Sequence, residues 1–397
     1  MSKRSLTLLA AAGAAFVLVL GVRPGAAQVP AELVVDDDAV ECPAATHATI
    51  QAAVDAVPSG GDANITVCAG AYDELVAISG KGAVRITGVG GPVLTPPGIT
   101  GDGRLIDVSA SRKVVIEGMT LDGNGEFSGA TSIRGIRVSD TSARILGNTV
   151  RKVHNATPDA ASAIGIQLSD LDPNDGTSKW TVADNVVDGY GAVGILAQGA
   201  GGTATISRNA VTGLGTRETP FNTRFAIGID VQLQASARIV HNTISQNWYE
   251  GPGCFVAPGV YLYEEKKVVV ARNTLTGNQG GVWVDSCCDG SPSLRNRVAG
   301  NTITGALYGI LVEVANVDGA TLVTPVNSKN AIVNNTLTTT VPNSAGVWLA
   351  KVDFDGAGVG IDPQLDDNRI GPNTIDGFAF PCIDQGTNTS TPLACSH

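Results

Sequence analysis

A glycine followed by alternating aliphatic residues recurs along the chain, and this recurrence constrains the fold more than any other feature. The eight copies begin at Gly135, Gly165, Gly194, Gly228, Gly259, Gly281, Gly309 and Gly346. In every copy the residues one and three positions after the glycine are apolar. Because successive side chains of a β-strand point to opposite faces, these apolar residues would share one buried face.

A second motif, centred on asparagine, alternates strictly with the glycine motif. Its eight copies are centred on Asn148, Asn185, Asn209, Asn242, Asn273, Asn301, Asn335 and Asn373. Each asparagine has Ile or Val three residues before it and Val, Ile or Leu two residues after it. We expect the asparagine at a sharp corner between two short inward-packed strands. Asparagine tolerates the left-handed conformation that such a corner needs, and stacked asparagines can hydrogen-bond to one another.

The ordered pair of motifs repeats about every 30 residues, which is typical of one coil of a solenoid. Like positions of successive coils would stack at the strand spacing of about 4.8 Å. An antiparallel β-sandwich is the alternative, but its hairpins do not require one ordered pair of motifs to recur in the same sense. The sequence therefore predicts an all-β fold, a solenoid of roughly ten coils with one continuous core.

The two ends of the chain differ from the repeats. Residues 1–27 have the features of an export signal, with Lys3 and Arg4 before an apolar run and small residues at 25–27, although a membrane anchor is the alternative. We expect an N-terminal cap and first coil at 28–80, the solenoid at 81–380 and a tail at 381–397. An amphipathic helix at 49–57 would cover the exposed strand edges of the first coil.

Charge and cysteine content limit the partners and the compartment. The formal net charge of −11 argues against nucleic acid, which calls for a basic stripe. The seven cysteines of an exported chain favour disulfides. We expect Cys42 to pair with Cys68 and Cys382 with Cys395, while the pairing of Cys254, Cys287 and Cys288 stays open. The prediction is a secreted or periplasmic monomer that has no membrane contact after signal removal.

This arrangement resembles the right-handed parallel β-helix repeat proteins of the pectin-lyase-like superfamily. The likeness covers roughly residues 40–380 and includes the segment 49–60 and the strand at 65–70, which look like the cap and first coil of such chains. It implies a single-stranded right-handed parallel β-helix with a short N-terminal capping helix and a disulfide-closed tail. It does not imply an activity, because this scaffold carries many functions.

The catalytic signatures of the superfamily are mostly absent. Neither the Asn-Thr-Asp nor the Gly-His-Gly motif of polygalacturonases occurs, and Asp366-Asp367 stands alone. No Gln-Asp motif of a pectin methylesterase is found. The segment 282–285 matches the Val-Trp-Ile-Asp-His stretch of pectate lyases in part, but Ser286 replaces the histidine.

The outward positions of the glycine strand, two and four residues after each glycine, supply the candidate site. Early coils carry small or polar residues there, whereas later coils carry carboxylates and aromatic rings. We expect Asp285, Glu313 and Asp230 as catalytic residues, and Tyr261, Tyr263, Trp283, Trp348 and Arg137 as substrate-binding residues. Asp285 and Glu313 occupy the same register on adjacent coils, so their carboxylates would lie about 5 Å apart, and repulsion would raise one pKa. The alternatives are solvated carboxylates and aromatic rings that only stack on one another.

Two functions follow from this face. The first is a secreted protein that binds or cleaves extracellular polysaccharide in the manner of a pectate lyase or a glycosidase, with Ca²⁺ as a possible cofactor. A lyase would also need a basic group, for which Lys351, Arg295 and Arg297 are available. The second is a non-catalytic surface or envelope protein with structural or adhesive duties. A copper-maturation role is disfavoured because Met119 is the single methionine after residue 27.

Overall fold

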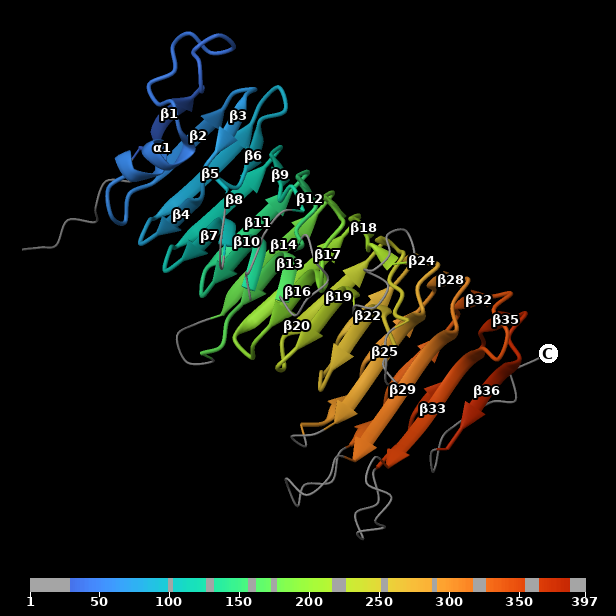
Figure 1. The fold of residues 1–397 in the computed structure, drawn as a ribbon. Coiled ribbons are helices and arrows are strands. Elements are labelled where there is room, and N and C mark those ends of the chain that lie inside the picture. Colours follow the sequence, from blue (N-terminus) through green and yellow to red (C-terminus); the bar gives the residue numbers. More distant parts are fainter. Residues whose placement is uncertain are drawn as a thin grey trace, which may run out of the picture.

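The computed structural model describes residues 29–98, 103–125, 132–155, 162–172, 177–215, 226–250, 256–287, 291–316, 326–353 and 364–385. They form a parallel β-helix in which the chain winds through three long parallel sheets that run the length of the molecule (Figure 1). The sheets contain 12, 11 and 11 strands, against the roughly ten coils that the repeats predict. The expected fold class is therefore confirmed.

The three long sheets, A, B and C, each take strands from successive coils of the chain. In spatial order, sheet A contains β1 (Ala31–Val35), β2 (Ala63–Val67), β5 (Ala83–Gly88), β8 (Lys113–Glu117), β11 (Ser142–Leu146), β14 (Ser178–Ala183), β17 (Gly202–Ser207), β20 (Ser236–Val240), β23 (Val269–Ala271), β27 (Arg297–Ala299), β31 (Ala331–Val333) and β34 (Arg369–Ile370). Sheet B contains β3 (Ala71–Asp73), β6 (Val93–Thr95), β9 (Thr120–Asp122), β12 (Thr149–Arg151), β15 (Val186–Asp188), β18 (Ala210–Thr212), β21 (Thr243–Ser245), β24 (Thr274–Thr276), β28 (Thr302–Thr304), β32 (Thr336–Thr338) and β35 (Thr374–Asp376). Sheet C contains β4 (Val76–Ser79), β7 (Gly103–Ser109), β10 (Ser132–Ser139), β13 (Ser162–Ser169), β16 (Val193–Gln198), β19 (Ile227–Gln232), β22 (Pro258–Tyr263), β25 (Gly280–Cys287), β29 (Tyr308–Asn316), β33 (Ala345–Asp353) and β36 (Phe380–Asp384). A further pair consists of β26 (Ser293–Leu294) and β30 (Asn327–Ser328).

The glycine motif forms eight of the eleven strands of sheet C, and its apolar positions build the core. Both inward residues of every copy are at most 1% exposed, and they belong to one apolar cluster that extends from Val35 to Phe378. The glycine itself is required by close approach of neighbouring coils. A Cβ on Gly228 would lie 2.4 Å from the carbonyl oxygen of Gly259 and 2.5 Å from Cγ2 of Ile244.

The asparagine motif forms a continuous ladder at the corner between sheets A and B. Each amide nitrogen from Asn148 to Asn335 donates to Oδ1 of the asparagine in the next coil, at 2.9–3.1 Å. The side chain of Asn242 also donates to the carbonyl oxygen of Ile206, which lies in the preceding coil. The predicted stacking is confirmed. Each ladder amide satisfies backbone groups that the corner would otherwise leave buried and unpaired.

The expected conformation of these asparagines is wrong. None of the eight has a positive φ; the left-handed residue is the one directly before the asparagine in all but the last copy, as in Asp184 (φ 61°) and His241 (φ 59°). The physical reason is the ladder, which requires the asparagine side chain to point inward. The preceding outward residue therefore makes the turn.

The N-terminal cap agrees with the prediction. Helix α1 (Ile50–Ala56) begins after Thr49, whose side chain accepts a hydrogen bond from the backbone N–H of Ala52. The disulfide between Cys42 and Cys68 joins the segment after β1 to the end of β2. Cys287 and Cys382 are also disulfide-bonded. Cys395, Cys254, Cys288 and the segment 1–27 lie outside the described residues, so the pairing of Cys382 with Cys395 and the export signal stay predictions.

The described part of the chain contains no candidate for a membrane-spanning helix. Its α-helix, α1, has 7 residues, and no described helix is long and apolar enough to span a bilayer.

The ladder makes a quantitative prediction about stability. Replacing Asn242 by Ala should lower the free energy of unfolding by about 3–5 kcal/mol, because several buried donors and acceptors would lose their partners at about 1–3 kcal/mol each. The control is Thr243→Ala, at the exposed neighbouring position of β21, which should change stability by less than about 1 kcal/mol. Urea denaturation measures both variants. Equal midpoints for the two variants would show that the ladder does not stabilise the corner.

Candidate functional site

The outward face of sheet C carries the predicted site residues in two parallel columns. Strand pairing places Asp230, Tyr261, Trp283, Leu311 and Trp348 in one register and Gln232, Tyr263, Asp285, Glu313 and Ala350 in the other. The columns cross β19, β22, β25, β29 and β33, which lie side by side in Figure 1. The structure thus brings seven of the eight predicted residues to one face. Asp285 and Glu313 are direct partners on adjacent strands, as predicted.

Arg137 lies on sheet C but outside the region that contains the other seven residues. It lies on β10, three strand pairings before Asp230, and its Nε donates to Oδ1 of Asp107 at 2.8 Å. An arginine already paired with a carboxylate is poorly placed to bind a distant substrate. The structure therefore does not bring Arg137 together with the other candidate residues, and substrate binding by Arg137 stays a prediction.

The three predicted catalytic carboxylates are buried rather than solvated. Asp230 and Asp285 are each 5% exposed and Glu313 is 9% exposed, although all three project from the outward side of the sheet. Oδ1 of Asp230 and Oδ1 of Asp285 have no hydrogen-bond partner among the described residues. The interpretation of these groups as ordinary surface carboxylates is therefore wrong.

Burial sets the ionisation of these groups. It raises the pKa of Asp230 to about 7, and it raises that of Glu313 to about 8, with the charge of Asp285 as a second cause. The pKa of Asp285 rises to about 6, because the hydrogen bond from Tyr261 and a backbone N–H of Ser286 offset part of the cost of burial. Repulsion between Asp285 and Glu313 was the expected cause of a raised pKa; burial is the larger one.

Tyr261 connects the two columns. Its Oη donates to Oδ2 of Asp285 at 2.6 Å, which stabilises the ionised form of that carboxylate. The same phenol is largely buried beside Asp285 and Asp230, so its own pKa is raised well above the ordinary value. Tyr261 therefore remains a hydrogen-bond donor at all moderate pH values.

The aromatic rings pack on one another. The ring of Tyr261 lies 5.0 Å from that of Trp283 and 6.0 Å from that of Tyr263, and Tyr308 lies 5.7 Å from Trp348, all between centroids. One apolar cluster contains Val256, Leu311, Ala350 and all of these rings except that of Tyr263. The rings thus pack on one another, as the alternative to ligand contact states, and contact of the rings with a ligand stays a prediction. Nε1 of Trp283 and Nε1 of Trp348 are buried, and neither has a hydrogen-bond partner in the described part of the chain.

Sequence reasoning missed two residues of this region. Glu265 follows β22 and is fully buried; burial raises its pKa to about 8, and the charge of Asp230 adds to the shift. No repeat position identifies it, because it lies beyond the strand. Tyr308 directly precedes Gly309, and strict alternation would place it on the inward face with Ile310. Its ring packs with Trp348 on the outward face instead, so the repeat pattern does not identify it.

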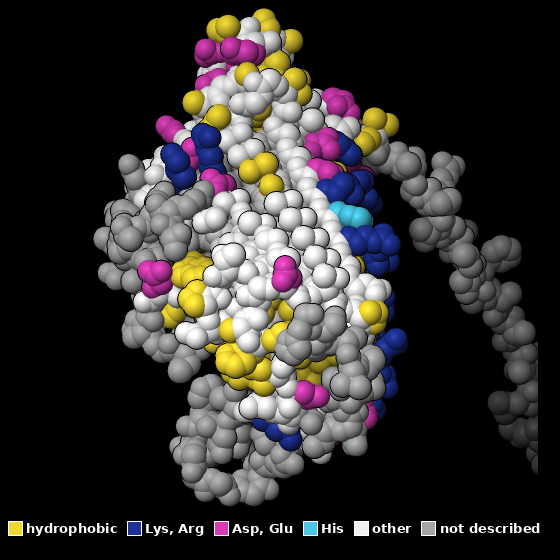
Figure 2. Space-filling model, turned by 90° about the vertical axis from the view of Figure 1, so that its right-hand side faces the viewer, with side chains coloured by type: hydrophobic (Ala, Val, Ile, Leu, Met, Phe, Trp, Pro, Cys, Tyr) yellow, Lys and Arg dark blue, Asp and Glu magenta, His cyan; other side chains and the backbone are white. Residues whose placement is uncertain are grey.

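A separate hollow lies on sheet A. It has a volume of about 340 Å³, and Arg238, His241, Arg272 and Arg297 are among its lining residues. None of the ion pairs between described residues includes these three arginines. Figure 2 shows Lys and Arg side chains gathered in a column along one edge of the molecule. This basic surface contrasts with the acidic balance of the whole chain.

Comparisons with known proteins agree with the fold. A family model described as a right-handed β-helix region matches residues 171–375, just over half of the chain. No curated protein matches the sequence significantly.

The solved structures that are similar include three carbohydrate-acting proteins. The A-module of a mannuronan C-5 epimerase from Azotobacter vinelandii is 17% identical, with a TM-score of 0.47 over 86% of this chain and 94% of that module. A periplasmic alginate epimerase is 14% identical, with a TM-score of 0.44 over 86% and 81% of the two chains. A lacto-N-biosidase from Eubacterium ramulus is 10% identical, with a TM-score of 0.49 over 86% and 67%. At these values the likeness concerns the fold alone.

Proposed function

Since the chain belongs to the right-handed β-helix family, whose long sheets present extended outer faces, we propose that it binds and cleaves extracellular polysaccharide on the outward face of sheet C. The observation that carries the proposal is the group of buried carboxyls with raised pKa values, Asp230, Asp285 and Glu313, on adjacent strands beside aromatic rings. Buried ionisable groups with unpaired oxygens are costly to fold, and such groups concentrate at functional sites.

Glycosidic bond cleavage suits the two central carboxyls. Near neutral pH, Glu313 with a pKa of about 8 holds a proton that it can give to a leaving oxygen. Asp285, with a pKa of about 6 and a hydrogen bond from Tyr261, is largely ionised and can act as base or nucleophile. Two carboxyls whose pKa values are driven apart by their surroundings are the usual arrangement for this reaction.

A lyase-type reaction has less support. It requires a basic side chain and a cation to neutralise a uronate, yet no ion pair between described residues joins Arg or Lys to Asp230, Asp285 or Glu313. Of the predicted bases, Arg297 lies on β27 of sheet A and lines the hollow there, and Arg295 lies at the corner before it. Lys351 lies on β33 of sheet C, where its strand partner on β29 is Val314.

The aromatic rings favour a sugar ligand, and the basic surface favours acidic sugars among the possible ligands. Tyr and Trp side chains combine an apolar ring with a polar edge, which suits stacking on sugar rings. The arginines around the hollow on sheet A would attract carboxylated chains and counter the net negative charge. The apolar run at 6–22 and the disulfide between Cys42 and Cys68 support a secreted or periplasmic location, where thiols are oxidised.

A screen of purified protein on polysaccharides tests the proposal. We expect new reducing ends without unsaturated products on at least one uronate-containing or neutral polysaccharide, with and without Ca²⁺. Unsaturated products would show that the protein breaks the glycosidic bond by elimination and not by hydrolysis. Absence of both cleavage and glycan-array binding would overturn the proposal.

The absence of the superfamily's catalytic motifs favours a second candidate, a non-catalytic surface or envelope protein. The same screen separates the two, because this candidate predicts binding or display without bond cleavage.

A further inference from the structure

We infer a calcium site in the N-terminal cap, formed by the carboxylates of Asp36, Asp37, Asp38 and Glu41. One carboxylate oxygen from each residue can be chosen so that the four atoms all lie within 4.8 Å of one another. Ca²⁺ binds carboxylate oxygens at about 2.3–2.6 Å, so oxygens on opposite sides of one ion lie about 5 Å apart. The spacing of the four groups therefore matches a single hard cation.

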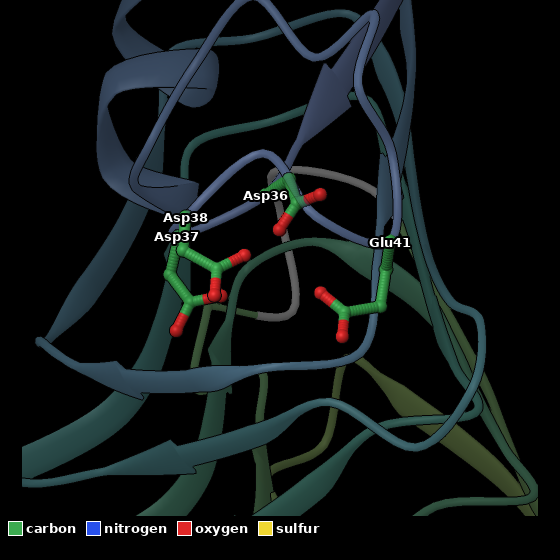
Figure 3. A group of neighbouring side chains, drawn as sticks. All are labelled: Asp36, Asp37, Asp38 and Glu41. Atoms are coloured by element: carbon green, nitrogen blue, oxygen red, sulfur yellow. The ribbon is translucent and has the colours of Figure 1, made fainter.

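Asp36 supplies an independent reason to expect a ligand. The residue is 3% exposed, and its buried Oδ1 has no hydrogen-bond partner within the segments that the structure describes, whereas Oδ2 accepts from the backbone N–H of Cys42. Figure 3 shows Asp36 between Asp37 and Asp38 on one side and Glu41 on the other, with a carboxyl oxygen directed into the space between them. A buried carboxylate oxygen without a donor needs a cation or a proton.

The negative charge of the four carboxylates favours a bound cation as their partner over hydrogen-bond donors of the protein alone. Four carboxylates converge here, and no Lys or Arg forms an ion pair with any of them among the described residues. Oδ2 of Asp37 accepts the backbone N–H of Ala71 at 3.1 Å, and a Cβ on Gly70 would lie 2.2 Å from Oδ1 of the same carboxylate. The bound cation would thus hold the segment after β1 against the start of β3.

Calcium fits this site better than magnesium or a transition metal. The four side chains offer oxygen only, and three of the four residues are exposed, which leaves room for the water ligands that complete a coordination number of six to eight. Mg²⁺ demands a smaller, near-octahedral set of oxygens at about 2.0–2.1 Å. The transition metals favour histidine or cysteine ligands, which are missing from this group.

Calorimetry and thermal unfolding of the full chain test the inference, using CaCl₂ after treatment with a chelator. We expect saturable binding of one Ca²⁺ and a rise in unfolding temperature of roughly 3 °C at a concentration 100 times the dissociation constant. Asp36→Asn should abolish both effects. Glu41→Gln, at an exposed position that cannot disturb packing, should weaken binding at least about 10-fold. Glu32→Gln, an exposed residue of β1 outside the group, is the matched control and should bind as the unmodified protein does.

Three outcomes would overturn the inference. They are no Ca²⁺ binding at millimolar concentration, equal binding by the Glu41→Gln variant, or equal stabilisation by MgCl₂. The cap lies at the β1 end of the stack, whereas Asp285 lies on β25 of sheet C, many coils away, so failure of this test leaves the proposed cleavage site unaffected.

Discussion

Replacing Asp285 by Asn should lower the rate of polysaccharide cleavage by about 100- to 10,000-fold, the range that general acid–base groups contribute. Asparagine keeps the size of the side chain and can still accept the hydrogen bond from Tyr261. It removes the negative charge that a base or nucleophile requires. Initial rates on the polysaccharide identified by the screen measure the effect. Asp376→Asn, the same change at an exposed position of β35, is the control and should retain full activity.

The pH dependence of the rate distinguishes the two carboxyls. Cleavage that needs an ionised Asp285 and a protonated Glu313 should be fastest near about pH 7, between their pKa values of about 6 and about 8. Glu313→Gln should remove the decline at alkaline pH as well as lower the rate, while the decline at acidic pH should persist. A variant that keeps both the rate and the complete bell-shaped profile would exclude Glu313 as the acid. Because the two groups interact, the measured values belong to the pair.

Replacing Asp230 by Asn should make the protein more stable at pH 8 and nearly unchanged at pH 4. The pKa of Asp230 is raised from 3.8 to about 7. Between these values the folded chain holds a proton that the unfolded chain has lost, so unfolding releases a proton and a higher pH favours it. The contribution of the neutral Asp230 carboxyl to the free energy of unfolding is fully present below about pH 4 and is lost as the pH rises through about 7. It amounts to about 4 kcal/mol.

Denaturant midpoints from pH 4 to pH 8 measure this effect. The variant should retain part of the decline in stability, because Asp285, Glu313 and Glu265 also have raised pKa values and act in the same direction. Asp376→Asn should leave the pH dependence as it is in the unmodified protein. If Asp230→Asn also leaves it unchanged, Asp230 is not held in its neutral form. This outcome would remove one of the three carboxyls from the proposed site.

The solenoid could be predicted from the sequence because its determinants are local and repeated. Ile229 and Val231 follow Gly228 as Ile310 and Val312 follow Gly309, and each pair can face only one way on a strand. The partner of a residue in a parallel stack is the same residue of the next copy. The pairing of Asp285 with Glu313 and the ladder from Asn148 to Asn373 therefore follow from counting along the chain.

The properties of the candidate site depend on contacts between residues that are distant in sequence, so only the tertiary structure decided them. Outward alternation predicts a solvated Asp230, but packing buries it and raises its pKa to about 7. The hydrogen bond from Tyr261 to Asp285 crosses between two columns of the sheet, and Glu265 approaches Asp230 from beyond a strand end. The repeat specifies which face a residue occupies. The burial and ionisation of that residue depend on the side chains that pack around it, and the repeat period of the sequence does not encode this packing.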